Sequence, residues 1–119
     1  MTSWDPWAYS EKVDVRSDTT DLVGYDVDAT DGHIGKVDEA SYDVGSGYVV
    51  VDTGPWIFGK KVLLPAGTIE NVDVENKRVF VGRTKDEIKD SPRFDATSYR
   101  EPNYRTDVGN YYGRFYQGF

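Results

Sequence analysis

Short apolar runs separated by turn sequences place the strongest limit on what this chain can fold into. Small and polar residues lie between the runs, as in Gly45-Ser46-Gly47 and Glu75-Asn76-Lys77. Short strands with a turn about every 8–12 residues are typical of small β-barrels and β-sandwiches. The sequence therefore predicts an all-β fold, a small antiparallel β-barrel, with strands at Leu22–Val27, Tyr48–Asp52, Val62–Pro65, Ile69–Val74 and Val79–Val81.

The stretch His33–Val44 (HIGKVDEASYDV) is the least regular part of this pattern. Ile34 and Val37 are three residues apart, as in a helix, whereas Tyr42 and Val44 are two apart, as in a strand. Turn sequences stand on both sides of the stretch. We therefore predict one long strand with a bulge, paired to its neighbours.

A short helix is expected after the last strand. Thr84-Lys85-Asp86-Glu87 fits the capping box, in which a hydroxyl and a glutamate three residues later satisfy free N–H groups at a helix start. Pro92 ends this helix, which we place near residues 84–90. The predicted organisation is an N-terminal arm at 1–20, the barrel with its helix at 21–92, and an aromatic-rich tail at 93–119, with both ends irregular.

Composition argues against several classes of function. The formal net charge of −7 disfavours nucleic-acid binding, because that affinity comes largely from Lys and Arg at phosphates, and it disfavours anionic membrane surfaces too. The chain has no cysteine, which excludes disulfides, thiolate metal sites and cysteine nucleophiles. The first residues lack the pattern of a signal peptide, and no run approaches the roughly 18 apolar residues of a transmembrane helix. We expect a cytoplasmic protein with no membrane span and no cofactor.

The order and spacing of these segments resemble the PRC-barrel family. The resemblance covers roughly residues 20–95 and rests on Gly24, Val27, Asp31-Gly32, Ile34-Gly35-Lys36-Val37, Asp43, Val49–Asp52, Val62–Pro65 and the segment Thr84–Pro92. It implies a compact antiparallel β-barrel that serves as a docking surface, without a catalytic activity. The family includes the cytoplasmic domain of the photosynthetic reaction-centre H subunit and a ribosome-maturation factor. This sequence shows neither the membrane helix of the first nor the separate N-terminal domain of the second, so we expect the stand-alone bacterial type.

An apolar insert interrupts the turn between two strands. Trp56, Ile57 and Phe58 stand between Gly54-Pro55 and Gly59, where polar residues are expected. One interpretation is that Ile57 or Phe58 fills an open end of the barrel. The other is that the tip is an exposed contact patch, with Trp56 outside.

The tail presents a similar choice. Aromatic residues dominate it, and aliphatic ones are nearly absent, so it cannot form a core of its own. It can therefore pack on its own barrel or on that of a neighbour. The candidate contact residues of the tail are Tyr111, Tyr112, Phe115 and Tyr116.

Polar residues are weaker candidates. The segment from Asp26 resembles a calcium loop, but Asp31 stands where the turn needs glycine, and Val37 where a bidentate glutamate is needed. His33 is the only histidine, which disfavours a catalytic triad or a zinc site. Scattered carboxylates can serve proton transfer or solubility, and we favour solubility; they are Asp26, Asp28, Asp31, Asp38, Glu39 and Asp43.

The sequence thus predicts a non-catalytic interaction or assembly module that forms a homodimer and binds an unidentified protein partner. Its contact elements are Trp56–Phe58 and the tail aromatics, with Trp4 and Trp7 as weaker candidates. Two alternatives remain. One is an RNA or ribosome-assembly accessory protein that uses Lys60, Lys61, Lys77 and Arg78; the other is a small-ligand or proton-handling site built from surface carboxylates.

Overall fold

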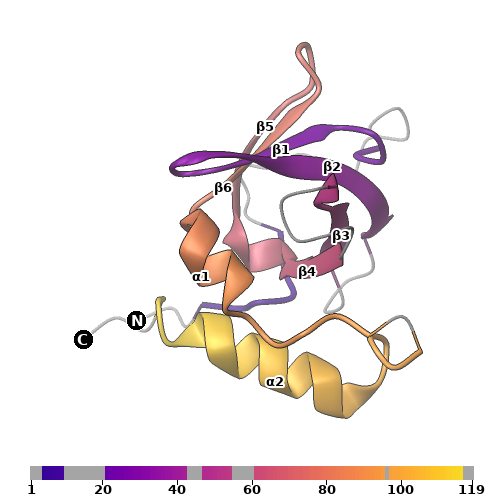
Figure 1. Cartoon of the computed structure of the whole chain (residues 1–119), viewed down its shortest axis with the longest axis vertical. Coiled ribbons are helices and arrows are strands. Elements are labelled where there is room, and N and C mark those ends of the chain that lie inside the picture. The colour runs from indigo at the N-terminus through magenta and orange to yellow at the C-terminus, as the bar shows by residue number, and fades with distance from the viewer. Residues whose placement is uncertain (1–3, 10–20, 43–46, 55–60, 96, 117–119) are drawn as a thin grey trace.

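The computed structural model describes residues 4–9, 21–42, 47–54, 61–95 and 97–116. One six-stranded sheet, in the order β4-β3-β2-β1-β6-β5, forms its centre. The strands are β1 (Asp26–Ala29), β2 (Gly32–Ser41), β3 (Tyr48–Asp52), β4 (Lys61–Pro65), β5 (Ile69–Asp73) and β6 (Arg78–Val81). Figure 1 shows the β5–β6 hairpin projecting from one side of the molecule and helix α2 (Pro102–Gly113) lying across the opposite side.

The sheet is mostly antiparallel, but the prediction of an antiparallel barrel is wrong for one pair. Strands β1 and β6 run parallel, with Asp26 opposite Arg78. Strands β4 and β5 lie at opposite edges of the sheet, although only Ala66–Thr68 separates them along the chain. The two edges therefore approach each other at that corner. Within the described residues β4 and β5 do not pair, so the fold is barrel-like with an unclosed sheet.

Strand β2 confirms the prediction of one long, bulged strand. It pairs with β1 on one side and β3 on the other, and its register with β3 shifts between Val37 and Glu39. At Gly35 the backbone of Asp52 comes so close that a Cβ atom would lie 2.1 Å from its carbonyl oxygen. Only glycine permits this approach, which lets β2 curve around the core.

The first strand begins later than the prediction of Leu22–Val27. The N–H of Tyr25 donates to the carbonyl of Leu22 at 3.0 Å, which makes a turn of residues 22–25. Gly24 has a φ of +90°, a conformation that glycine adopts without strain. Strand β1 therefore starts at Asp26, although Gly24 still donates to the carbonyl of Val37 at 2.8 Å.

Branched aliphatic residues of the strands form the core. Strand β3 carries three consecutive valines, Val49–Val51, all of them buried. Continuous apolar runs of this kind occur where both faces of a strand are covered. Leu64 of β4, Ile88 of the first helix and Tyr112 of α2 complete the same cluster, each with no exposed surface.

The predicted short helix is present as α1 (Lys85–Lys89). Its capping box is complete: the Thr84 hydroxyl accepts from the N–H of Glu87 at 3.1 Å, and the N–H of Thr84 donates to Glu87 Oε1 at 2.9 Å. Ile88 is the buried residue of this helix. Because one turn is unstable alone, docking of Ile88 on the sheet stabilises it.

The prediction of an irregular tail is wrong for residues 102–113. They form α2, the longest helix of the described chain, with Pro102 in its first turn. Proline is favoured there because its missing N–H has no partner in any helix. Tyr104, Val108 and Tyr112 are spaced four apart and so lie on one face of α2, and Val108 and Tyr112 are buried. The scarcity of aliphatic residues conceals this stripe in the sequence.

Candidate interaction surface

The first predicted contact element, Trp56–Phe58, lies outside the described residues. The two strands that flank it pair up to their ends: Asp52 at the end of β3 lies opposite Lys61 at the start of β4. Whether its side chains fill the barrel or face solvent stays a prediction.

The second element, the aromatic tail, packs against its own chain. Tyr112 has no exposed surface and belongs to the core. Tyr111 is partly buried, and its hydroxyl donates to the carbonyl of Glu87 in α1 at 2.6 Å. The rings of Tyr111 and Phe115 meet edge to face, with centroids 5.5 Å apart. Tyr111 and Tyr112 therefore join α2 to the rest of the fold.

The end of the tail meets the start of the chain in a group that we name the terminal cluster, comprising Trp4, Arg83, Phe115 and Tyr116. The rings of Trp4 and Tyr116 are stacked, with centroids 4.1 Å apart. The guanidinium of Arg83 lies 4.9 Å from the ring centroid of Phe115 and 4.8 Å from that of Tyr116. All four residues are only partly buried. The terminal cluster thus presents aromatic and arginine side chains at the surface, the types enriched at binding hot spots.

The N-terminal segment lies between the sheet and α2. The carbonyl of Trp7 accepts from the N–H of Gly47 at 2.9 Å, and that of Pro6 accepts from the N–H of Gly67 at 2.9 Å. The Trp4 indole donates to the carbonyl of Gly67 at 3.0 Å. These contacts fix residues 4–7 of the N-terminal arm against the sheet.

Trp7 also contacts α2 directly. The guanidinium of Arg105 lies 4.6 Å from the Trp7 ring centroid and 5.5 Å from that of Tyr48 on β3. Its Nη2 atom is buried without a hydrogen-bond partner among the described residues. Cation–π contact is favourable, but it does not replace the missing hydrogen bond.

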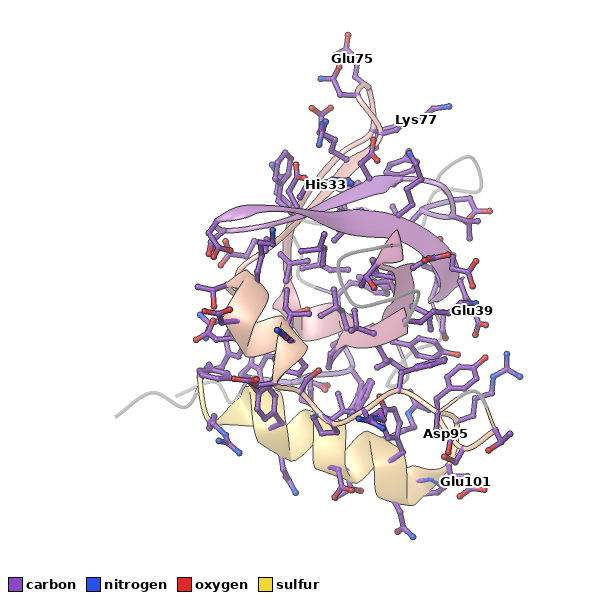
Figure 2. The ribbon with its side chains drawn as sticks, viewed as in Figure 1. His33, Glu39, Glu75, Lys77, Asp95 and Glu101 are labelled. Atoms are coloured by element: carbon purple, nitrogen blue, oxygen red, sulfur yellow. The ribbon has the colours of Figure 1, made fainter. Side chains whose placement is uncertain are left out.

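Glu39 on β2 gathers three donors, a group we name the Glu39 cluster. Its carboxylate accepts from the Tyr99 hydroxyl at 2.8 Å, from the Tyr48 hydroxyl at 3.0 Å and from Arg100 Nη2 at 3.2 Å. Figure 2 shows Glu39 at the side of the sheet, facing the segment that carries Asp95. This segment joins α1 to α2, and we call it the connector. The cluster therefore ties the connector before α2 to the sheet.

The electrostatics of the Glu39 cluster follow from these contacts. Burial disfavours the ionised carboxylate, but hydrogen bonds from Tyr99, Arg100 and Tyr48 outweigh burial and lower the pKa of Glu39. The pKa values of Tyr48 and Tyr99 are raised, first by burial and then by the hydrogen bond to Glu39. No local sequence pattern indicates this cluster, because Glu39 and Tyr99 lie 60 residues apart.

Three of the other predicted carboxylates, Asp26, Asp28 and Asp38, occur in ion pairs at the surface. Asp31 accepts from the N–H of Lys85 at 2.8 Å, and Asp43 lies outside the described residues. Asp28 contacts His33 at 3.2 Å and Arg78 at 2.7 Å. The side chain of His33 is 54% exposed, so this group is open to water. Asp26 pairs with Lys36 at 2.8 Å. The described residues contain no group of three or more metal-ligating side chains. These acids thus form a solvated surface with alternating charge.

The residues of the predicted RNA surface are distributed differently. Lys61 pairs with Asp38 at 2.7 Å, and Arg78 is paired with Asp28. Figure 2 shows Glu75 at the tip of the projecting hairpin and Lys77 below it, projecting to the side. Lys60 lies outside the described residues. Two members of this set, Lys61 and Arg78, are therefore each paired with a carboxylate.

Two comparisons with known proteins gave a match. The model of the PRC-barrel domain family matches residues 15–88. A solved structure, a putative 16S ribosomal RNA processing protein RimM from Pseudomonas aeruginosa, is 18% identical with a TM-score of 0.47. The match covers 61% of this chain and 49% of that one, so it spans about half of the RimM protein. No curated protein sequence matches the chain. Among the described residues, no helix is long and apolar enough to cross a membrane.

Proposed function

We propose, from the premise that this chain belongs to the PRC-barrel family, that it is a non-catalytic interaction module that forms a homodimer. Membership rests on the family match over residues 15–88, which is more than half of the chain. The contact elements are the Trp56–Phe58 insert and the partly buried aromatics of the tail, Tyr111, Phe115 and Tyr116.

The terminal cluster is the observation that carries this proposal. It brings Trp4, Arg83, Phe115 and Tyr116 together from three distant parts of the chain and leaves each of them partly exposed. Tryptophan, tyrosine and arginine are the residues most enriched at interface hot spots. The carboxylates around β1 and β2, by contrast, are in open ion pairs and support no enclosed reaction site.

The oligomeric state of the full chain tests the proposal. We expect light scattering after size-exclusion chromatography to give a dimer, and Trp56→Ser with Phe58→Ser to give a folded monomer. Val74→Ser is the matched control, because Val74 is 51% exposed in the turn of the β5–β6 hairpin, which we call the far hairpin. A monomeric full chain at all concentrations would overturn self-association. An unfolded double variant would show that the insert belongs to the core.

An accessory role on RNA is the alternative function. The RimM protein is described as a ribosomal RNA processing protein, whereas here Lys61 and Arg78 each pair with an aspartate. Binding to phosphates releases counterions, so true RNA binding weakens steeply as salt rises. Retention of the full chain on RNA at low salt, lost on substituting Lys61 and Arg78 together, would favour this alternative over protein–protein contact.

A further inference from the structure

We propose that residues 4–7 and α2 form a clasp that opens as one unit while the six-stranded sheet stays folded. The closed clasp buries Tyr112 and covers Tyr111, Phe115 and Tyr116 in part, and opening exposes these rings fully for contact with a second copy of this chain. The opening itself is a property of the fold. Only the identity of what the exposed side chains contact rests on the proposed function.

Helix α2 is weak by its own composition. Its twelve residues include Gly109 and Gly113 as well as two asparagines and a threonine, all poor helix formers. Glu101 at its N-cap makes no side-chain capping hydrogen bond, and no acidic residue lies in its first turn. A helix of this length and composition is unstable in water without tertiary contacts.

Tertiary contacts therefore hold α2 in place. Val108 and Tyr112 are its buried residues. The hydroxyl of Tyr104 donates to the carbonyl of Pro92 at 3.3 Å, and that of Tyr111 donates to the carbonyl of Glu87 at 2.6 Å. Because the helix depends on these contacts, undocking and unfolding of α2 occur together.

Residues 4–7 contact α2, the residues that follow it, and Gly47 and Gly67 beside the sheet. Trp4 stacks on Tyr116, three residues beyond α2. Trp7 contacts Arg105 of α2, and a Cβ atom at Gly109 would lie 3.5 Å from both Pro6 and Trp7. Figure 1 shows this segment, in indigo, between β4 and α2. When α2 detaches, residues 4–7 lose their contacts on that side. The two parts of the clasp are therefore coupled.

One buried group makes the closed clasp less stable. Arg105 Nη2 has no hydrogen-bond partner among the described residues when the clasp is closed. On opening, this nitrogen regains water, so the desolvation penalty disappears. Elements with few buried residues and such penalties open at lower free energy than the core of a fold.

The predicted contact residues of the tail are fully or partly covered in the closed state. Tyr112 has no exposed surface, and Tyr111, Phe115 and Tyr116 are partly buried. Full contact of these rings with a second copy therefore requires the clasp to open first. Clasp opening would thus regulate the proposed self-association.

Amide hydrogen exchange, measured by NMR on the full chain, tests the clasp without any partner. The amides of Gly47 and Gly67 report on residues 4–7, since they donate to Trp7 and Pro6. The amides of Val108 and Tyr112 report on α2, and that of Val50 in β3 reports on the sheet. We expect the four clasp amides to share one opening free energy and to exchange at least about a hundredfold faster than Val50. Exchange of α2 at the rate of Val50 would overturn the proposal.

A stabilising variant tests whether the two parts are one unit. Gly113 lies in the last turn of α2 with no other atom within 4 Å of a Cβ placed there. Gly113→Ala should slow exchange at Val108 and Tyr112 about fivefold through helix propensity. We expect the same factor at Gly47 and Gly67, and no change at Val50. Unchanged Gly47 and Gly67 would refute the coupling.

Destabilisation should act in the opposite direction. Trp4→Ala removes the stack on Tyr116 and the hydrogen bond to Gly67. It should speed all four clasp amides by one common factor, whereas Val74→Ala, at the far hairpin, should leave them unchanged. A dimer without a separately opening clasp would refute this inference alone. A separately opening clasp in a chain that stays monomeric would instead refute the proposed function.

Discussion

The six-stranded sheet and helix α2 lie on the same core but depend on it differently. The sheet has local turns, long-range strand pairing and continuous buried runs such as Val49–Val51. Helix α2 has poor intrinsic helix propensity and is docked through two buried residues, Val108 and Tyr112. The same hydrophobic cluster thus contains residues of a sheet that has its own stabilising contacts and residues of a helix that forms only when it is docked. Loss of a core residue should therefore have different consequences in the two regions.

A truncation inside the sheet should have the largest effect. Leu64 in β4 has no exposed surface, so Leu64→Ala should lower the free energy of unfolding by about 2–5 kcal/mol. Urea titrations followed by tryptophan fluorescence and by circular dichroism should show one shared, earlier transition. A change below about 0.5 kcal/mol, the size expected for the exposed control Val74→Ala, would contradict the assignment of Leu64 to the core.

The matching truncation in α2 should be milder for the sheet. Tyr112→Ala removes a buried aromatic ring, which commonly costs about 3–5 kcal/mol. Here the loss of global stability should be no larger than the free energy of clasp opening, because a further loss only detaches α2 and leaves the sheet folded. Circular dichroism at 222 nm should lose helical signal while the Val50 amide stays protected. Sheet and helix unfolding together would remove the distinction between the two regions.

Gly67→Ala should disturb the contact between residues 4–7 and the sheet. A Cβ atom at this position would lie 2.5 Å from the carbonyl oxygen of Asp5 and 2.8 Å from the Trp4 ring. We expect a destabilisation of about 1–3 kcal/mol and a shift of tryptophan fluorescence towards that of exposed indole. Val74→Ala is the control, since Val74 is 51% exposed on the β5–β6 hairpin, away from residues 4–7. An unchanged emission spectrum would show that residues 4–7 are not clamped at Gly67.

The Glu39 cluster should make the connector sensitive to acid. The folded-state pKa of Glu39 is lower than its usual value of 4.5, so its stabilisation is present above pH 4.5 and is lost as pH falls through the lower value. Glu39 is partly exposed, which limits the effect to under about 1 kcal/mol. Glu39→Gln should flatten the decline of stability at acidic pH. An identical decline in both proteins would assign acid sensitivity to other carboxylates.

Alkaline pH should act on α2. Burial raises the pKa of Tyr104 from 10.0 to about 12. The stabilisation from its neutral hydroxyl is thus complete below pH 10 and is lost as pH rises towards 12. Tyr104→Phe should reduce this decline, measured as the unfolding free energy at each pH. A steeper decline in Tyr104→Phe would contradict the burial of this hydroxyl.

Local pattern explains which parts of the fold could be predicted. The long bulged strand β2 follows from turn sequences on both sides of it, and helix α1 follows from the capping box at Thr84 and Glu87. Both signals lie within a few residues, where sequence and structure are directly linked. Helix α2 was not predicted, because its stripe of Tyr104, Val108 and Tyr112 contains one aliphatic residue and its neighbours favour turns.

Only part of the candidate surface could be predicted from the sequence. The sequence singled out Phe115 and Tyr116, with Trp4 as a weaker candidate. It indicated neither the stacking of Trp4 on Tyr116 nor the guanidinium of Arg83 beside the rings of Phe115 and Tyr116. Such partners are more than 30 residues apart in several cases, as Arg83 and Phe115 are, and no local pattern relates them. The same holds for the donors around Glu39.

By itself, the sequence determined the family, the β-rich class and the short capped helix, since these depend on spacing between near neighbours. The tertiary structure alone decided that β1 pairs parallel with β6, that residues 102–113 are helical, and that both ends of the chain meet at Trp4 and Tyr116. The physical reason is that burial on a shared core supplies stability that local propensity lacks. That burial depends on residues which only folding brings together.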